Sequence, residues 1–381
     1  MQYRLKISLF LALSLSNPAW GISLQEAVNS GNPELILEAV HSGVSGNEAV
    51  SWKINDAVVS GTLLNYACQN GLFDVVKLLL EKGADVNEKT DYGWTALMSA
   101  TSGSHLDVLK LLLEKGATPN AKYGMGWTAL MWAAEFGDIE VVRLLLEKGA
   151  APSVKDREGR TALLRAAEYG SLEVVKLLIE KGADPNSKDN HGYTVLMGAA
   201  EDGNVDVVKL LLEKGADPDS KMENERWTAL MWAAHGGHVE VVKLFLDKGL
   251  NPDEKRKDGY TALISAAQNG HVEVVRLLLE KGSDPKVKAD DGWTALMWAA
   301  DFGQFEVAKL LVEKGSDPKA QENNGYTVVM RAAKEGHLDL VKLLLEKGAD
   351  LSLRNNEGQT ALDIAREEGR DNVVKYLETL K

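Results

Sequence analysis

A threonine recurs along this chain at an almost constant interval, and that period constrains the fold more than any other feature of the sequence. Ten threonines, which we call marker threonines, define the period: eight of the nine intervals between them are 33 residues, and the interval from Thr194 to Thr228 is 34. Self-similarity at such a period is the signature of repeat architectures. We therefore predict a stack of similar units instead of the two or three globular domains that 381 residues would otherwise suggest. The marker threonines are Thr62, Thr95, Thr128, Thr161, Thr194, Thr228, Thr261, Thr294, Thr327 and Thr360.

The repeat that begins at Thr128 shows what one unit contains. Thr128 is placed to cap a short helix over residues 129–134, which ends at Gly137 because glycine adopts a left-handed backbone at little cost. Asp138 is placed to cap a second helix, which is apolar around most of its circumference and ends near Gly149. Such a helix pair cannot bury its apolar surface alone, so the sequence predicts that neighbouring repeats stack and cover it.

The segments Gly126-Trp127-Thr128, Ala133–Gly137 and Leu144–Ala150 resemble the repeat of the ankyrin family, and similar segments run through nearly the whole chain after residue 21. The resemblance implies an all-α ankyrin-repeat solenoid of helix–turn–helix units with β-hairpin fingers, about eleven in number with degenerate caps. We expect a degenerate N-terminal capping repeat over 22–43, a longer connecting segment over 44–60, nine repeats over 61–359 and a C-terminal capping repeat over 360–381. The extra residue near Met222–Arg226, where the usual glycine is missing, predicts a differently shaped finger.

Residues 1–21 have the pattern of a secretory signal peptide. A basic start precedes an apolar run from Ile7 to about Leu15, Pro18 breaks the run, and Ala19 and Gly21 are small. We expect cleavage after Gly21 and a periplasmic or secreted protein of a kind more typical of bacteria. The alternatives are a buried first helix or an uncleaved anchor. No other apolar run approaches membrane-spanning length, so we expect no stable membrane insertion.

Charge and motif content argue against several function classes. The chain has 43 Lys+Arg against 56 Asp+Glu, so it lacks the surplus of cations that nucleic-acid binding requires. The single Cys68 excludes an internal disulfide, and the histidines show no metal-binding spacing; His238, His271 and His337 stand at the starts of second helices, where we expect capping. Phosphate-binding glycine loops and nucleophile motifs are absent. We expect no catalysis, no cofactor and no metal.

Aromatic residues recur at two places in the repeat, and we expect them to form the binding surface. The finger position stands immediately before the marker threonine, and the resemblance implies that it points toward the concave face; the inner position stands four residues after the threonine and holds tryptophan or arginine in five repeats. Aromatic and arginine side chains are the usual interface hot spots. Phe136, Tyr169 and Phe302 add rings near the end of the first helix. The predicted partner-binding residues are Trp94, Trp127, Trp132, Arg165, Tyr193, Trp227, Trp232, Tyr260, Trp293, Trp298, Tyr326 and Arg331.

The partner that this surface predicts is another protein, bound by a monomeric, non-enzymatic scaffold. Because Glu135, Glu168, Asp202 and Asp301 flank the rings, we expect the partner to present apolar and basic side chains. Four alternatives stay open at this point: the rings only pack between adjacent turns, the rings bind a glycan or cell wall by stacking on sugars, the protein is a passive spacer, or it is an enzyme. An enzyme would need acids or histidines that converge in one pocket, and their spacing gives none.

Overall fold

The computed structural model describes residues 23–54, 57–90 and 93–380, and the chain divides into two compact units at Asp184–Pro185. The predicted signal peptide, residues 1–21, lies outside the described residues. Within the described ranges the structure has 22 helices and two strands, which confirms the predicted all-α class. No helix in these ranges has both the length and the apolar character needed to cross a bilayer.

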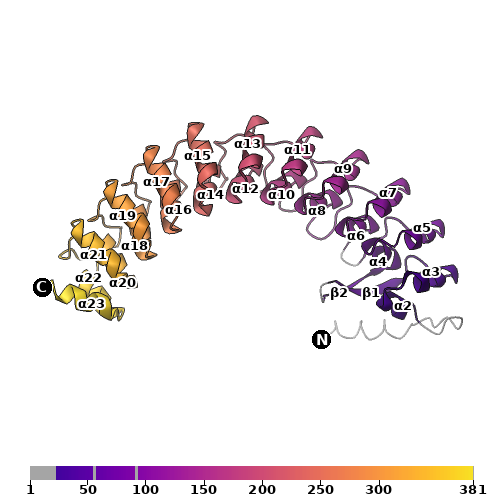
Figure 1. Cartoon of the computed structure of the whole chain (residues 1–381), viewed down its shortest axis with the longest axis horizontal. Helices are drawn as coiled ribbons and strands as arrows, with labels where there is room; N and C mark the ends of the chain where they lie inside the picture. The colour runs from indigo at the N-terminus through magenta and orange to yellow at the C-terminus, as the bar shows by residue number, and fades with distance from the viewer. Residues whose placement is uncertain (1–22, 55–56, 91–92, 381) are drawn as a thin grey trace. The chain divides into compact units, whose positions relative to one another are not determined.

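Within each unit the first helices of successive repeats pack in one row and the second helices pack in another (Figure 1). The first unit contains α2 (Leu24–Ser30), α3 (Pro33–His41), β1 (Ala49–Ile54), β2 (Ala57–Thr62), α4 (Leu63–Gln69), α5 (Phe73–Glu81), α6 (Ala96–Ser102), α7 (Leu106–Glu114), α8 (Ala129–Glu135), α9 (Ile139–Glu147), α10 (Ala162–Glu168) and α11 (Leu172–Glu180). The second unit contains α12 (Val195–Glu201), α13 (Val205–Glu213), α14 (Ala229–Gly236), α15 (Val239–Asp247), α16 (Ala262–Gln268), α17 (Val272–Glu280), α18 (Ala295–Asp301), α19 (Phe305–Glu313), α20 (Val328–Glu335), α21 (Leu338–Glu346), α22 (Ala361–Glu367) and α23 (Asp371–Glu378).

Local capping fixes where these helices begin and end, as the sequence predicts. Every marker threonine is an N-cap whose hydroxyl accepts a backbone N–H three residues later; for Thr128 the donor is Met131, at 3.3 Å. Asp138 caps α9 by accepting from the Val141 N–H at 3.1 Å. Gly137 and Gly149 follow the two helices with φ of +71° and +93°, a region that glycine enters without strain. The boundaries of each helix pair are therefore set within the repeat itself.

Small residues on the first helices let neighbouring repeats approach closely. Ala133 and Ala134 of α8 are buried, as are Val141, Val142 and Leu145 of α9, and the two helices are in contact. Burial of this kind continues from repeat to repeat, so there is no single central core; the apolar surface of each helix pair is covered by its neighbours.

The segment that we expected only to connect the N-terminal cap to the first full repeat forms a β-hairpin. Its strands β1 and β2 are antiparallel, with Trp52 opposite Val59. The Trp52 ring packs edge-on against Tyr66 of α4 at 5.6 Å, and the Tyr66 hydroxyl donates to the Val28 carbonyl of α2 at 3.0 Å. These contacts join the N-terminal helices to the stack.

The finger that carries the extra residue differs from the others, as predicted. Its closing hydrogen bond runs from the Met222 N–H to the Trp227 carbonyl, five residues apart, whereas the finger of the preceding repeat closes from the Asp189 N–H to the Tyr193 carbonyl, four residues apart. Arg226 takes a φ of +61° in place of the missing glycine.

The histidines at the starts of second helices have a different role from the expected capping. His238, His271 and His337 occupy the N-cap residue, but their side chains make no capping hydrogen bond with their own helix. Instead, Nε2 of each ring contacts a carbonyl oxygen at the end of the preceding repeat's first helix; for His238 this is the Glu201 oxygen, at 2.7 Å. The rings therefore connect neighbouring repeats.

Candidate functional site

Three tryptophan pairs form the centres of the aromatic surface. In each pair a finger-position ring contacts the inner-position ring five residues later, because the marker threonine turns the chain from the finger directly into the first helix. The centroid distances are 5.2 Å for Trp127–Trp132, 4.4 Å for Trp227–Trp232 and 4.3 Å for Trp293–Trp298. The pairing of the two predicted rows follows from the local structure of one repeat.

An arginine from the following repeat covers the finger-position ring of every pair. The guanidinium carbon lies 4.2 Å from the Trp127 ring for Arg165, 4.5 Å from Trp227 for Arg256 and 4.3 Å from Trp293 for Arg331. This is the geometry of a cation–π contact. One face of each of these rings is thus occupied by the chain's own cation.

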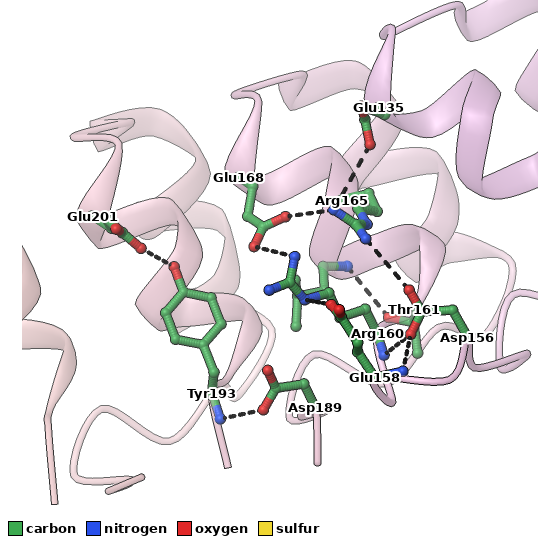
Figure 2. Close-up of polar contacts among 11 residues, drawn as sticks. Glu135, Asp156, Glu158, Arg160, Thr161, Arg165, Glu168, Asp189, Tyr193 and Glu201 are labelled. Carbon is green, nitrogen blue, oxygen red and sulfur yellow. Dashed lines mark hydrogen bonds and ion pairs between the residues drawn. The ribbon is translucent and has the colours of Figure 1, made fainter. Parts of the chain in front are cut away.

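Arg165 lies among three carboxylates, as Figure 2 shows. Its closest ion pair is with Asp156 of the finger, at 3.4 Å, and pairs with Glu168 and Glu135 follow at 3.7 and 3.8 Å. The Asp156 side chain is 1 % exposed, and its Oδ1 also accepts the N–H groups of Glu158 and Arg160. A buried carboxylate that is shared by two amides and a guanidinium fixes the position of the arginine.

Arg331 has equivalent partners in the second unit. It pairs with Glu322 at 3.2 Å and with Asp301 at 3.9 Å, and the Glu322 side chain is 1 % exposed. The guanidinium also lies 4.5 Å from the Tyr326 ring. The arginine is again held between a buried finger carboxylate and an acid at the end of the preceding first helix.

Arg256 reaches its tryptophan from a different place in the repeat. It stands on the finger, lies over both Trp227 and Tyr260, and pairs with Asp258, whereas the inner position of its repeat is Ser265. Our sequence prediction did not include Arg256, because it belongs to neither aromatic row. The sequence held one indication of this contact. The inner position of the repeat that follows the other two tryptophan pairs is an arginine, but here it is Ser265.

The remaining predicted residues also join these clusters. Trp94 contacts Tyr123 at 4.9 Å and Trp132 at 5.6 Å, and the Tyr123 hydroxyl accepts from the Trp132 indole at 3.2 Å. In the second unit Tyr193 packs edge-on against Trp232, and its hydroxyl donates to the Glu201 carboxylate (Figure 2). These rings therefore pack against rings of adjacent repeats, as one of the alternatives above proposed.

The most exposed phenylalanine and tyrosine rings in the described part of the chain lie at the ends of the first helices. Tyr193, Trp227 and Arg165 are buried and the other nine predicted residues are half-buried. By contrast, Phe136 is 70 % exposed, Tyr169 58 % and Phe302 52 %. Phe136 stacks on Trp132 at 5.5 Å with its plane tilted by 4°, and Phe302 lies 5.6 Å from Trp298. The most accessible rings were thus outside the predicted set, although their position in the sequence was visible.

Burial shifts the ionisation of groups around the clusters. It raises the pKa of the Glu135 carboxyl against the opposing charges of Arg165 and Arg160, and it raises the pKa of Asp301 against Arg331. Burial, with the nearby Asp291 carboxylate, raises the pKa of Tyr260 to about 12. For Glu135 and Asp301, the neighbouring arginines therefore do not fully offset the cost of burying the ionised carboxylate.

Potential metal ligands are dispersed in the described part of the chain, and its cysteine is buried. No group of three His, Cys, Asp or Glu side chains within residues 23–54, 57–90 and 93–380 is arranged to hold a metal ion. Cys68 is buried on α4, and burial raises the pKa of its thiol, which keeps the thiolate that nucleophilic chemistry needs unpopulated.

Comparison with known proteins identifies a family. The family model described as ankyrin repeats (3 copies) matches residues 24–123, 119–189, 175–256, 196–289, 251–322 and 296–379. A search of curated proteins found no match.

Proposed function

Since the chain belongs to the ankyrin-repeat family, whose repeats are general scaffolds for protein–protein interaction and typically lack catalysis, we propose that it binds another protein through an aromatic-lined concave face. The observation that carries this proposal is the exposure of Phe136 and Phe302, each resting on a half-buried tryptophan. Large apolar side chains that stay exposed on a fixed support are typical of interface hot spots.

The arginine contacts support binding by ordering the surface in advance. Trp132 and Trp298 are held by their finger tryptophans, which are covered in turn by Arg165 and Arg331. Association costs free energy when side chains must be immobilised, and rings that are already fixed reduce this cost. The twelve residues predicted from the sequence act in this proposal mainly as the support, and Phe136, Tyr169 and Phe302 act as the contact points.

The same contacts favour a protein partner over a glycan. Sugars bind to aromatic rows by stacking on open ring faces, and the faces of Trp127, Trp227 and Trp293 are covered on one side by guanidinium groups. Apolar side chains of a protein can pack against either the edge or the face of an exposed phenylalanine ring, so they do not need an open row of ring faces.

Export is a second part of the proposal and depends on residues 1–21, the basic and apolar segment ahead of Ile22. We expect the mature protein to be a monomer in the periplasm or outside the cell. Cell fractionation followed by N-terminal sequencing tests this: the expected mature chain starts at Ile22. Full-length protein that stays in the cytoplasm would show that export is wrong.

The binding proposal is tested by affinity capture from the envelope and culture fractions, with the exported protein as bait. A variant with Phe136→Ser, Tyr169→Ser and Phe302→Ser changes only exposed rings and is expected to keep the fold, which circular dichroism and urea unfolding check. Phe305→Ser, an exposed ring at the start of the second helix α19, is the matched control.

We expect the native chain and the Phe305 variant to retain the same protein and the triple variant to lose it. If the triple variant retains that protein unchanged, the aromatic face is not the binding surface. If soluble cell-wall glycan fragments quench the tryptophan fluorescence while no protein is retained, the glycan alternative is correct.

A further inference from the structure

Six positions of the first unit have counterparts in the second unit at a constant offset of 166 residues: four residues are identical, and at the other two Glu and Asp are exchanged. We call each set a ring–arginine module. The first module is Trp127, Trp132, Glu135, Phe136, Asp156 and Arg165, and the second is Trp293, Trp298, Asp301, Phe302, Glu322 and Arg331. Each module spans two consecutive repeats, since its arginine and its finger carboxylate come from the repeat that follows the tryptophans.

The two modules have nearly the same geometry. The arginine lies 4.2 and 4.3 Å from its tryptophan ring, 3.4 and 3.2 Å from its buried carboxylate, and 3.8 and 3.9 Å from its second acid. The exposed phenylalanine lies 5.5 and 5.6 Å from the inner tryptophan. The two units thus present the same arrangement of an exposed ring beside a partly accessible carboxylate.

The repeat pattern alone does not require this arrangement. The third tryptophan pair, Trp227 and Trp232, has His235 and Gly236 where the modules have an acid and a phenylalanine. Its covering arginine, Arg256, comes from the finger, and the exposed ring beside the pair is that of His235, which lies edge-on at 5.8 Å from Trp227, so the pair lacks the exposed phenylalanine and the acid of the modules. Stacking of repeats is therefore possible without the module, and the module carries features beyond what stacking needs.

We infer that each module is a binding site for the same short epitope, an apolar side chain next to lysine or arginine, and that the partner carries this epitope twice. This inference rests on the proposed function and adds the chemistry and the valence of the partner. The exposed phenylalanine receives the apolar side chain. Glu135 or Asp301 beside it attracts the cation, because carboxylates outnumber the arginine among the module's own charges.

The charges next to the two modules differ, but they balance in each unit. Glu168 beside Arg165 is paired with Arg160 at 3.8 Å, and in the second unit Lys334 stands next to Glu335. We therefore expect the two modules to bind a basic epitope with similar affinity. A partner with two epitopes gains affinity over a single epitope because its second contact is intramolecular.

The test uses fluorescein-labelled glycine–serine decapeptides that contain one Leu-Arg pair, with Leu-Glu and Ser-Arg peptides as controls, titrated against the full mature chain. Fluorescence anisotropy and calorimetry give affinity and stoichiometry. We expect two Leu-Arg peptides per chain and at least five-fold weaker binding of both control peptides. Phe136→Ser and Phe302→Ser should each reduce the stoichiometry to one, and the double variant should bind none. Phe305→Ser, which changes an exposed ring outside the modules, should leave the stoichiometry at two.

Valence is measured with peptides that carry two Leu-Arg pairs joined by glycine–serine linkers of increasing length. At a linker length that spans both sites, we expect at least ten-fold tighter binding than for the single peptide, and either phenylalanine variant should remove the gain. One peptide per chain, or unchanged binding by the folded double variant, would overturn the inference. The capture experiment separates the two proposals: a captured partner that depends on the exposed rings upholds the proposed function even if the peptides fail.

Discussion

The guanidinium of Arg165 covers the ring of Trp127 at 4.2 Å, although the two residues belong to different repeats. The same guanidinium pairs with Asp156, Glu135 and Glu168, so it connects a finger and two consecutive first helices. Arg165, which we predicted from the sequence to contact a partner, thus connects neighbouring repeats. Its binding role is indirect, through the ring that it holds.

Arg165→Met should lower the free energy of unfolding by about 3 kcal/mol, because it leaves the buried Asp156 carboxylate without its cation. Urea unfolding monitored by tryptophan fluorescence measures the change. Arg143→Met is the control, since Arg143 makes only a 4.0 Å exposed pair with Glu140, and its loss should cost less than about 0.5 kcal/mol. Equal effects of the two substitutions would show that the Arg165 cluster adds no stability.

Glu135→Gln should stabilise the protein at neutral pH and should lose this advantage in acid. Burial raises the pKa of Glu135 in the folded state, so the folded protein favours the protonated carboxyl, and its ionised form weakens folding above that pKa. Glutamine stays neutral throughout. As the pH falls through the raised pKa, wild-type Glu135 takes up its proton and the two proteins converge.

The measurement is the difference in urea midpoint between the Glu135→Gln variant and wild type from pH 7 to pH 4. Taking the difference removes the contribution of the other titrating groups. Asp301→Asn should behave in the same direction, because burial also raises the pKa of Asp301. A variant that is less stable than wild type at pH 7 would contradict the predicted sign.

Ser104→Gly should raise the free energy of unfolding by about 1 kcal/mol. Ser104 has a φ of +56°, where the side chain of an L-residue is strained, and other repeats have a glycine at this place, such as Gly137. Thermal or urea unfolding detects the gain. The reverse case is Gly149→Ala, where φ is +93° and an added Cβ meets no other atom, so the strain alone should cost a similar amount.

Thr128→Ala should cost about 1–2 kcal/mol, since the Met131 N–H then loses its acceptor at a buried helix start. Ser171 is a matched control because it is the N-cap of α11 but makes no capping hydrogen bond with its side chain. Ser171→Ala should therefore change stability by less than about 0.5 kcal/mol. If both substitutions cost the same, the hydroxyl contact of Thr128 is not what stabilises α8.

The sequence alone determined the repeat, its helix pairs and their caps. These depend on interactions within about ten residues, such as Thr128 with Met131, and on a period that repeats them; stacking then follows from apolar surface that one repeat cannot bury. The pairing of Trp127 with Trp132 was also implicit, because finger and helix are adjacent in the chain.

Only the tertiary structure decided which side chains remain accessible. Arg165 and Arg256 reach the same kind of ring from different positions in the repeat, so no single position in the pattern predicts the contact. Exposure depends on neighbours that are about 33 residues away and are brought together by stacking: it leaves Phe136 open and buries Tyr193. Contacts between repeats therefore determine which side chains are exposed, whereas interactions within about ten residues determine the structure of the repeat.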